Sequence, residues 1–191
     1  MKNIQDIDFN AIRDRVHQIA CEHGWHDEEH SVDHYMMLII TEFSEAVNAD
    51  RRNRHAKVDL FNLNQETSAY NEEEHFMQLF EMYIKDTVED ELADAAMRVL
   101  DFAKENGIDF GGLSQIVSSD KLLLETFRQL PDFCTCTLGM VMILITEENL
   151  SLLLMAIFEV AELYHIDLLW HIEQKMKYNE MRPYKHGGKK Y

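Results

Sequence analysis

Chain-breaking residues are scarce, and this scarcity restricts the fold more than any other feature of the sequence. Only 2 prolines and 7 glycines occur among 191 residues, so long stretches contain no residue that would end a helix. The β-branched residues do not alternate with polar ones as they would in half-buried strands. With 46% hydrophobic residues, the chain can bury a sizeable core. We therefore expect an all-α helical bundle, in which residues 1–191 form a single domain.

Apolar residues recur at intervals of three and four in several segments, and each such segment predicts an amphipathic helix. Ser31 or Asp33 is expected to cap the second helix, and Asp86 followed by Glu89 resembles a capping box at the start of the fourth. Residues 51–71 are polar and predict a loop. The predicted helices cover residues 8–23, about 31–50, 73–84, 86–106, 120–129, 132–147, 150–164 and 167–181.

Two pairs of carboxylates continue the apolar stripes of the second and fourth predicted helices. They are Glu42 and Glu45 in "EFSE", and Glu91 and Asp94 in "ELAD". Buried carboxylates must be protonated, paired with bases or bound to a metal, because burying an unpaired charge is costly. Two antiparallel helices could bring all four together. Oxygen-only ligands suit a hard cation such as Mg²⁺ or Mn²⁺, and a metal-bound water beside a further carboxylate is a ready nucleophile.

The order E-x-x-E, spacer, E-x-x-D and basic C-terminal helix resembles that of the all-α nucleoside triphosphate pyrophosphohydrolases, which include the MazG-like proteins, the dimeric dUTPases and the dCTP pyrophosphatases. This resemblance implies a helical bundle of the MazG-like type, with Glu42, Glu45, Glu91 and Asp94 as Mg²⁺ ligands. It also implies hydrolysis of a nucleoside triphosphate at the α–β phosphoanhydride, giving the monophosphate and pyrophosphate, as in removal of unwanted nucleotides. Glu45, or else Glu42, would be the catalytic residue that orients or deprotonates the attacking water.

The resemblance also assigns substrate contacts at both ends of the chain. In the C-terminal segment, Lys175, Asn179 and Arg182 would contact phosphate oxygens, for which charged and amide donors are suited. A basic, flexible tail over about 183–191 would follow them, and its lysines could fold over the site. Near the N-terminus, the base and sugar would lie against Trp25, His26 and His30. The alternative for Trp25, and the more common one for a lone tryptophan, is a core anchor.

Two features depart from the family pattern. The spacer over residues 46–90 is long, so it either carries a specificity lid or indicates that the second acidic pair is misassigned. The chain also contains an internal echo, because "MLIITE" at 37–42 recurs as "MILITE" at 142–147, and residues 96–110 match 154–168 in apolar pattern. This echo suggests an internally duplicated four-helix core, in which one half supplies metal ligands and the other supplies phosphate contacts.

Charge and cysteine content limit the partners and the compartment. The formal net charge of −17 repels nucleic acid and anionic membranes, so we expect neither as a partner. The three cysteines form no disulfide framework and indicate reduced thiols in a cytoplasmic protein. No secretory signal is visible at the N-terminus. The apolar segment over residues 138–163 contains acidic interruptions, which predict two buried helices rather than a membrane span.

Two other classes of protein remain open from the residues alone. A ferritin-type di-iron bundle would use E-x-x-H motifs, of which Glu72 with His75 and Glu162 with His165 are examples. A non-catalytic helical bundle could bind a partner protein through some of its 11 methionines. The sequence leaves the preferred nucleobase undecided, and it is compatible with a homodimer.

Overall fold

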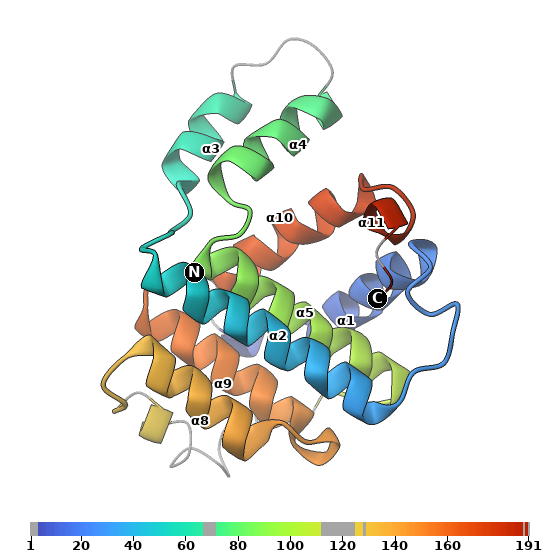
Figure 1. The fold of residues 1–191 in the computed structure, drawn as a ribbon, viewed down its shortest axis with the longest axis vertical. Coiled ribbons are helices and arrows are strands. Elements are labelled where there is room, and N and C mark those ends of the chain that lie inside the picture. Colours follow the sequence, from blue (N-terminus) through green and yellow to red (C-terminus); the bar gives the residue numbers. More distant parts are fainter. Residues whose placement is uncertain (1–3, 67–71, 112–124, 128, 189, 191) are drawn as a thin grey trace.

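The protein is described by a computed structural model that places residues 4–66, 72–111, 125–127, 129–188 and 190 (Figure 1). All regular structure in these residues is helical, and this confirms the all-α fold class. The helices are η1 (Ile4–Asp6), α1 (Phe9–Glu22), α2 (Val32–Arg51), α3 (Val58–Gln65), α4 (Glu72–Tyr83), α5 (Val88–Glu105), α8 (Phe133–Leu144), η2 (Glu147–Asn149), α9 (Leu150–Leu163), α10 (Leu168–Glu180) and α11 (Lys185–Gly188).

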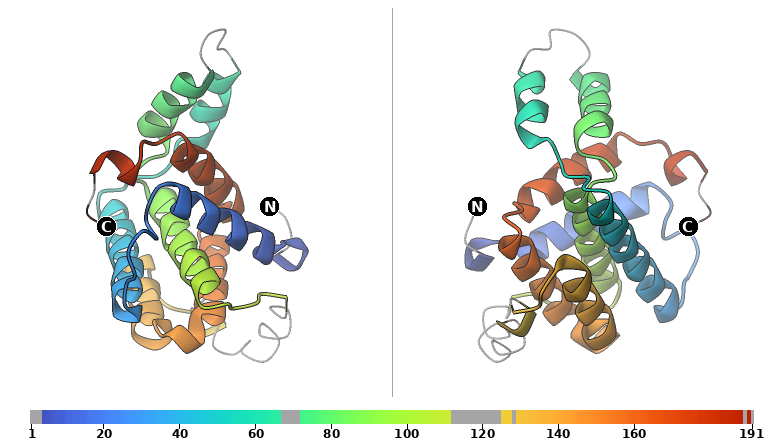
Figure 2. Two further views of the ribbon diagram at one scale, coloured as in Figure 1. Left: turned by 90° about the vertical axis from the view of Figure 1, so that its right-hand side faces the viewer. Right: turned by 60° about the vertical axis from the view of Figure 1, so that its left-hand side comes forward.

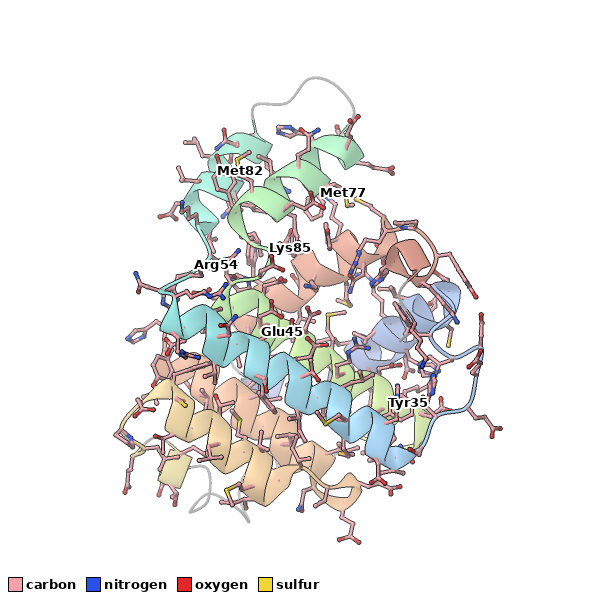
Figure 3. The ribbon with its side chains drawn as sticks, in the orientation of Figure 1. Tyr35, Glu45, Arg54, Met77, Met82 and Lys85 are labelled. Atoms are coloured by element: carbon pink, nitrogen blue, oxygen red, sulfur yellow. The ribbon has the colours of Figure 1, made fainter. Side chains whose placement is uncertain are left out.

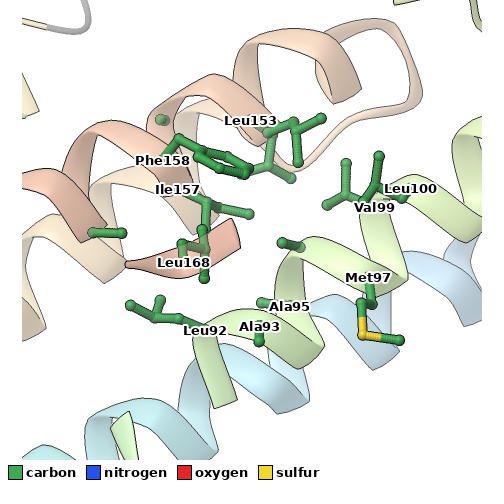
Figure 4. Packing of buried hydrophobic residues seen from close by; sticks show 14 of the residues in the cluster. Leu92, Ala93, Ala95, Met97, Val99, Leu100, Leu153, Ile157, Phe158 and Leu168 are labelled. Carbon is green, nitrogen blue, oxygen red and sulfur yellow. The ribbon is translucent and has the colours of Figure 1, made fainter. Parts of the chain in front are cut away.

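Helix α5 is the centre of the bundle, with α1, α2, α9 and α10 packed around it (Figures 1 and 2). It can contact neighbours on several sides because many of its buried positions are alanines, among them Ala93, Ala95 and Ala96, which let other helices approach closely. Larger apolar side chains of α5 lie near those of α9 and α10 (Figure 4). The residues shown there include Leu92, Val99, Leu100, Leu153, Ile157, Phe158 and Leu168. The backbone of α5 is therefore held in place by packing on most sides.

Helices α2 and α5 run antiparallel, as the two acidic motifs require. The ring of Tyr35, early in α2, stacks on that of Phe102, late in α5, with 4.7 Å between the centroids. At the opposite end, the backbone N–H of Val88 donates to the carbonyl of Arg54 at 3.1 Å. Residue numbers therefore rise along α2 as they fall along α5, and Glu42 comes opposite the middle of α5, where the Nε of Arg98 donates to it.

Helices α3 and α4 form a hairpin that projects from the bundle beyond α10 (Figures 1 and 2). Its apolar side chains form a second cluster in which Phe61, Phe76 and Phe80 meet Tyr178 of α10. The expectation of a loop throughout 51–71 is wrong, because residues 58–65 are helical. The local sequence gives only a weak helix signal there, and the ring of Phe61, fully buried between Phe76 and Trp170, supplies the stabilisation instead.

Most helix ends lie close to the predicted positions, and the exceptions have local causes. Ser31 caps α2, as expected, by accepting from the N–H of His34. The capping box expected at Asp86 is wrong: the N-cap is Thr87, whose hydroxyl accepts from the N–H of Asp90, while Asp86 has a φ of +56°. The helix predicted over 120–129 lies mostly outside the described residues, although 125–127 are helical.

The apolar segment over residues 138–163 forms two helices, α8 and α9, as predicted. Helix α9 is largely buried, whereas α8 exposes Leu138, Met142 and Ile143. Within the described residues, no single helix is long and apolar enough to cross a membrane; one bent pair, 133–144 with 147–163, meets the length and composition requirement with a 116° break between its members.

Candidate metal and phosphate site

A polar cavity of about 250 Å³ opens among α1, α2, α5 and α10. Figure 3 labels two of its residues, Glu45 on α2 and Lys85 in the connection before α5. Its lining combines carboxylates and basic groups with a few apolar side chains. The lining residues are Val16, Ile19, Ala20, Trp25, Glu42, Glu45, Lys85, Asp86, Glu91, Asp94, Met97, Arg98, Asp101, Lys175, Asn179, Arg182 and His186.

Three of the four predicted metal ligands converge in this cavity. Glu42, Glu91 and Asp94 each offer a carboxylate oxygen, and the three oxygens lie within 4.8 Å of one another. Glu42 and Glu91 are buried, and Asp94 is half-buried. Glu45 lines the same cavity from an exposed position but is not part of this cluster. The antiparallel pairing of α2 and α5 therefore does bring distant acids together.

The nearby basic side chains do not neutralise all of the carboxylates in this cluster. Glu42 accepts from the Nε of Arg98 at 2.9 Å, yet burial and the neighbouring Asp94 raise its pKa to about 7. Among the described residues, no hydrogen bond or ion pair to the Glu91 carboxylate occurs. Burial, followed by the charges of Asp94 and Asp90, raises the pKa of Glu91 to about 9. Without an added cation, the site therefore holds protons at neutral pH.

Lys175 lies deep in the site, but its ammonium group is held by carboxylates. Its Nζ donates to both oxygens of Asp90 at 2.8 and 2.9 Å and lies 2.6 Å from Oδ2 of Asp94. Burial acts to lower the pKa of Lys175, but these two acids outweigh it and raise the pKa. Burial raises the pKa of Asp90 to about 6; because Lys175 contacts both of its oxygens, we take the pair as ionised at neutral pH. Lys175 therefore orients Asp94 in this structure, and its expected phosphate contact stays a prediction.

The other predicted phosphate residues face the cavity. Asn179 is buried, and its Oδ1 has no partner among the described residues. Arg182 is half-buried, and its guanidinium lies over the ring of Tyr178 at 5.5 Å. The chain beyond it returns to the α1 end: the N–H of Lys185 donates to the carbonyl of His23 at 3.0 Å, and Tyr184 hydrogen-bonds Asp27.

The residues predicted to meet the base and sugar separate into three environments. Trp25 lines the cavity, with its ring edge-on to His186. His26 does not line the cavity. Its Nε2 bonds to Asp101, and Asp101 is one of the lining residues. His30 lies away from the cavity lining and stacks on His34, with 4.2 Å between the ring centroids. The structure thus brings Trp25 to the cavity directly and His26 only through Asp101.

Sequence reasoning missed three charged residues of α5. Arg98 lies one turn after Asp94 and on the same helical face, so its i, i+4 spacing was a usable signal. The sequence carries no comparable signal for Asp90 and Asp101. Their partners Lys175, His17 and His26 come from other helices or loops. Burial raises the pKa of Asp101, but hydrogen bonds from His17 and His26 outweigh it, and the net pKa is lowered.

Comparison with known proteins adds no identification: no family model, curated protein or solved structure matches the chain. The fold class is therefore established by the helices alone, and the class of site is defined by its carboxylates and cavity.

Proposed function

We propose that the chain is a Mg²⁺-dependent nucleoside triphosphate pyrophosphohydrolase of the MazG-like type. The observation that carries the proposal is the convergence of Glu42, Glu91 and Asp94, from two separate helices, in a cavity that Arg182 also lines. A polyphosphate needs a divalent cation and a positive side chain in the same place. The cavity lining offers carboxylates for a cation, the basic side chain of Arg182 and several apolar side chains.

The residues present fit a hard divalent cation. All three donors are carboxylate oxygens, the ligands that Mg²⁺ and Mn²⁺ prefer. Glu91 is buried with no ion-pair partner among the described residues, and a bound metal would offset the burial and the neighbouring acids that raise its pKa. When bound, Mg²⁺ would supply charge neutralisation of the phosphates and acidification of a coordinated water. Arg98 and Lys175 would hold Glu42 and Asp94 in place.

The remaining roles follow from position. Glu45 is exposed on the cavity wall, so its carboxylate is free to accept a proton from an attacking water without first being desolvated. Arg182 and Lys85 are basic lining residues that would face phosphate oxygens, although Lys85 also lies 3.4 Å from Asp86, and Asn179 lines the same cavity. Val16, Ile19 and Met97 are apolar lining residues, and together with Trp25 they offer surface against which a nucleoside would pack.

The internal echo has a counterpart in helix packing. Helix α2 contacts α5, α8 contacts α9, and the two pairs meet through α2 with α8 and α5 with α9. We extend the proposal to a duplicated four-helix core in which only the first pair retains the acids: Asn149 and Leu152 occupy the positions that match Glu91 and Asp94. The residues matching the phosphate contacts, 117, 121 and 124, lie outside the described residues. One carboxylate metal site per chain is expected, and two equivalent carboxylate sites would contradict this reading.

The test is a panel of canonical and modified nucleoside triphosphates incubated with Mg²⁺ and scored for pyrophosphate against orthophosphate. The expected product is pyrophosphate with the nucleoside monophosphate. The Glu91→Gln variant should lose activity without losing the fold, because Glu91 is already protonated in the metal-free protein and glutamine has nearly the same shape. Glu73→Gln, at an exposed position on α4, is the matched control and should retain activity. Release of orthophosphate alone would contradict cleavage at the α–β bond.

A partner-binding bundle is the second candidate, and it is favoured by one surface. Leu138, Met142 and Ile143 of α8 are 55%, 76% and 54% exposed and lie on one side of the helix. A homodimer through this face is compatible with the hydrolase proposal. The di-iron alternative has less support: neither metal-capable cluster of the described residues contains an E-x-x-H histidine, and His75 bonds to the carbonyl of Asn64.

A further inference from the structure

A second group of metal-ligating side chains lies next to Asp101, a lining residue of the cavity, and outside the carboxylate cluster. His17 and Cys21 are one turn apart on α1, so they share a helical face. His26 follows in the connection between α1 and α2. Each of the three offers one ligand atom, and these atoms lie within 4.8 Å of one another. No member of this group belongs to the carboxylate cluster.

The donor set selects a different ion from the carboxylate cluster. Two imidazoles and a thiol suit a borderline-soft divalent ion, above all zinc, and suit Mg²⁺ poorly. The Sγ of Cys21 lies 3.4 Å from the Nε2 of His17. In a tetrahedral zinc site, with Zn–S near 2.3 Å and Zn–N near 2.0 Å, adjacent sulfur and nitrogen ligands are about 3.5 Å apart. The spacing of these two side chains therefore already matches coordination.

Asp101 of α5 hydrogen-bonds both imidazoles through the ring nitrogens that would not bind the metal. Its buried carboxylate accepts from the Nδ1 of His17 at 2.8 Å and from the Nε2 of His26 at 2.9 Å. A proton on each of these nitrogens leaves the lone pairs on Nε2 of His17 and Nδ1 of His26, which face Cys21 Sγ at 3.4 Å and the Tyr35 hydroxyl at 3.4 Å. Donation of the second ring N–H to a carboxylate is the usual support for a metal-binding histidine. Glu105, 3.5 Å from the Nδ1 of His26, places a further oxygen within reach.

We propose that His17, Cys21 and His26 form a zinc site, oriented by Asp101, that fastens the connection between α1 and α2 to the bundle. The metal displaces the thiol proton of Cys21 on binding. Trp25 precedes His26 directly and lines the cavity, so zinc fixes the position of this ring. The proposal does not depend on the hydrolase activity, because the site shares no ligand with Glu42, Glu91 and Asp94.

The test uses the full chain stripped of metal and titrated with Zn²⁺ and, separately, with Co²⁺. All titrations are repeated in a Glu91→Gln background to remove binding at the carboxylates. A thiolate-to-cobalt charge-transfer band is expected in both backgrounds, together with one tightly bound Zn²⁺ per chain. Cys21→Ser should abolish the band and weaken zinc binding by about 100-fold or more, and Asp101→Asn should keep the band and weaken binding by about 10–100-fold.

Cys134→Ser is the matched control, since Cys134 is an exposed thiol that is not part of the cluster. It should leave the band and the zinc affinity unchanged. Circular dichroism checks that each variant is folded; Cys21 is exposed, so serine is expected to be tolerated there. Absence of the band in the unmodified chain, or its survival in Cys21→Ser, would overturn the proposal.

Discussion

Binding of Mg²⁺ to the carboxylate cluster should release protons, because the structure leaves the cluster partly protonated at neutral pH. Glu91, with a pKa of about 9, is almost fully protonated at pH 7. Glu42, with a pKa of about 7, is about half protonated. A cation binds the ionised forms, so both groups must give up whatever protons they carry. The perturbation is therefore the addition of Mg²⁺ to the metal-free protein at a series of pH values.

The expected magnitude follows from the two pKa values. At pH 7, about one proton leaves Glu91 and about half a proton leaves Glu42, so the total lies between one and two. At pH 8, Glu42 is mostly ionised and the total falls to about one. The logarithm of the apparent Mg²⁺ affinity should rise with pH by the same number, with a slope between one and two near pH 7.

Isothermal titration calorimetry in buffers with different ionisation enthalpies, such as HEPES and Tris, measures the number of protons released on Mg²⁺ binding. The slope of the observed enthalpy against the ionisation enthalpy of the buffer is negative, and its magnitude equals the number of protons released. Glu91→Gln should lower the number by about one, whereas the exposed-site variant Glu73→Gln should leave it unchanged. Mg²⁺ binding that releases no proton would refute the reasoning, since it would mean that burial does not hold these carboxyls in the acid form.

Replacing Lys175 by Met should lower the free energy of unfolding by about 3–5 kcal/mol, because it leaves the buried Asp90 carboxylate without its cation. Urea denaturation measures the loss, and the Asp90→Asn/Lys175→Met double variant should recover much of it; a loss below about 1 kcal/mol contradicts the buried pair. Burial lowers the pKa of His171 from its ordinary 6.5 to about 4, so the unfolded chain takes up a proton in this window while the folded chain does not. Stability should therefore fall by about 3 kcal/mol as the pH drops from 7 to 4, and His171→Leu should remove that part of the acid dependence; an identical pH profile in both proteins would exclude His171 as its source. Glu45→Gln should lower the turnover number by about 100- to 10,000-fold without changing the melting temperature, because the side chain is exposed; full activity would remove Glu45 from the proton transfer.

The sequence predicted the helices because their causes are local. Few breakers, apolar spacing and the cap at Ser31 are properties of neighbouring residues, and the predicted helices that fall within the described residues are present. Helix α3 was missed for the opposite reason: its stabilisation comes from Phe61 packed between Phe76 and Trp170, which are distant in sequence. Helices that depend on tertiary contacts leave little periodic signal.

The residues of the site also separate into those that the sequence could indicate and those that it could not. Glu42, Glu91 and Asp94 could be proposed from spacing, because each pair lies on one helical face. The basic groups that neutralise part of this charge could not be proposed from spacing. The contact between Lys175 and Asp90, for example, depends on how α10 crosses α5. His26 was expected at the base and sugar, but its partner Asp101 comes from α5. Spacing within a helix is readable from one sequence, whereas the register between helices has no comparable signal.

The long spacer over residues 46–90 raised the question whether the second acidic pair was correctly assigned, and the hairpin ends bear on it. The N–H of Lys57 donates to the carbonyl of Tyr83 at 2.9 Å, so the chain leaves and re-enters the bundle at one point. The N–H of Ala56 also donates to the Glu89 carboxylate at 2.8 Å. An insertion whose ends meet in this way lengthens the chain without shifting α2 against α5. The two acidic motifs therefore face each other as they would with a short connection, and the spacer is no argument against pairing them.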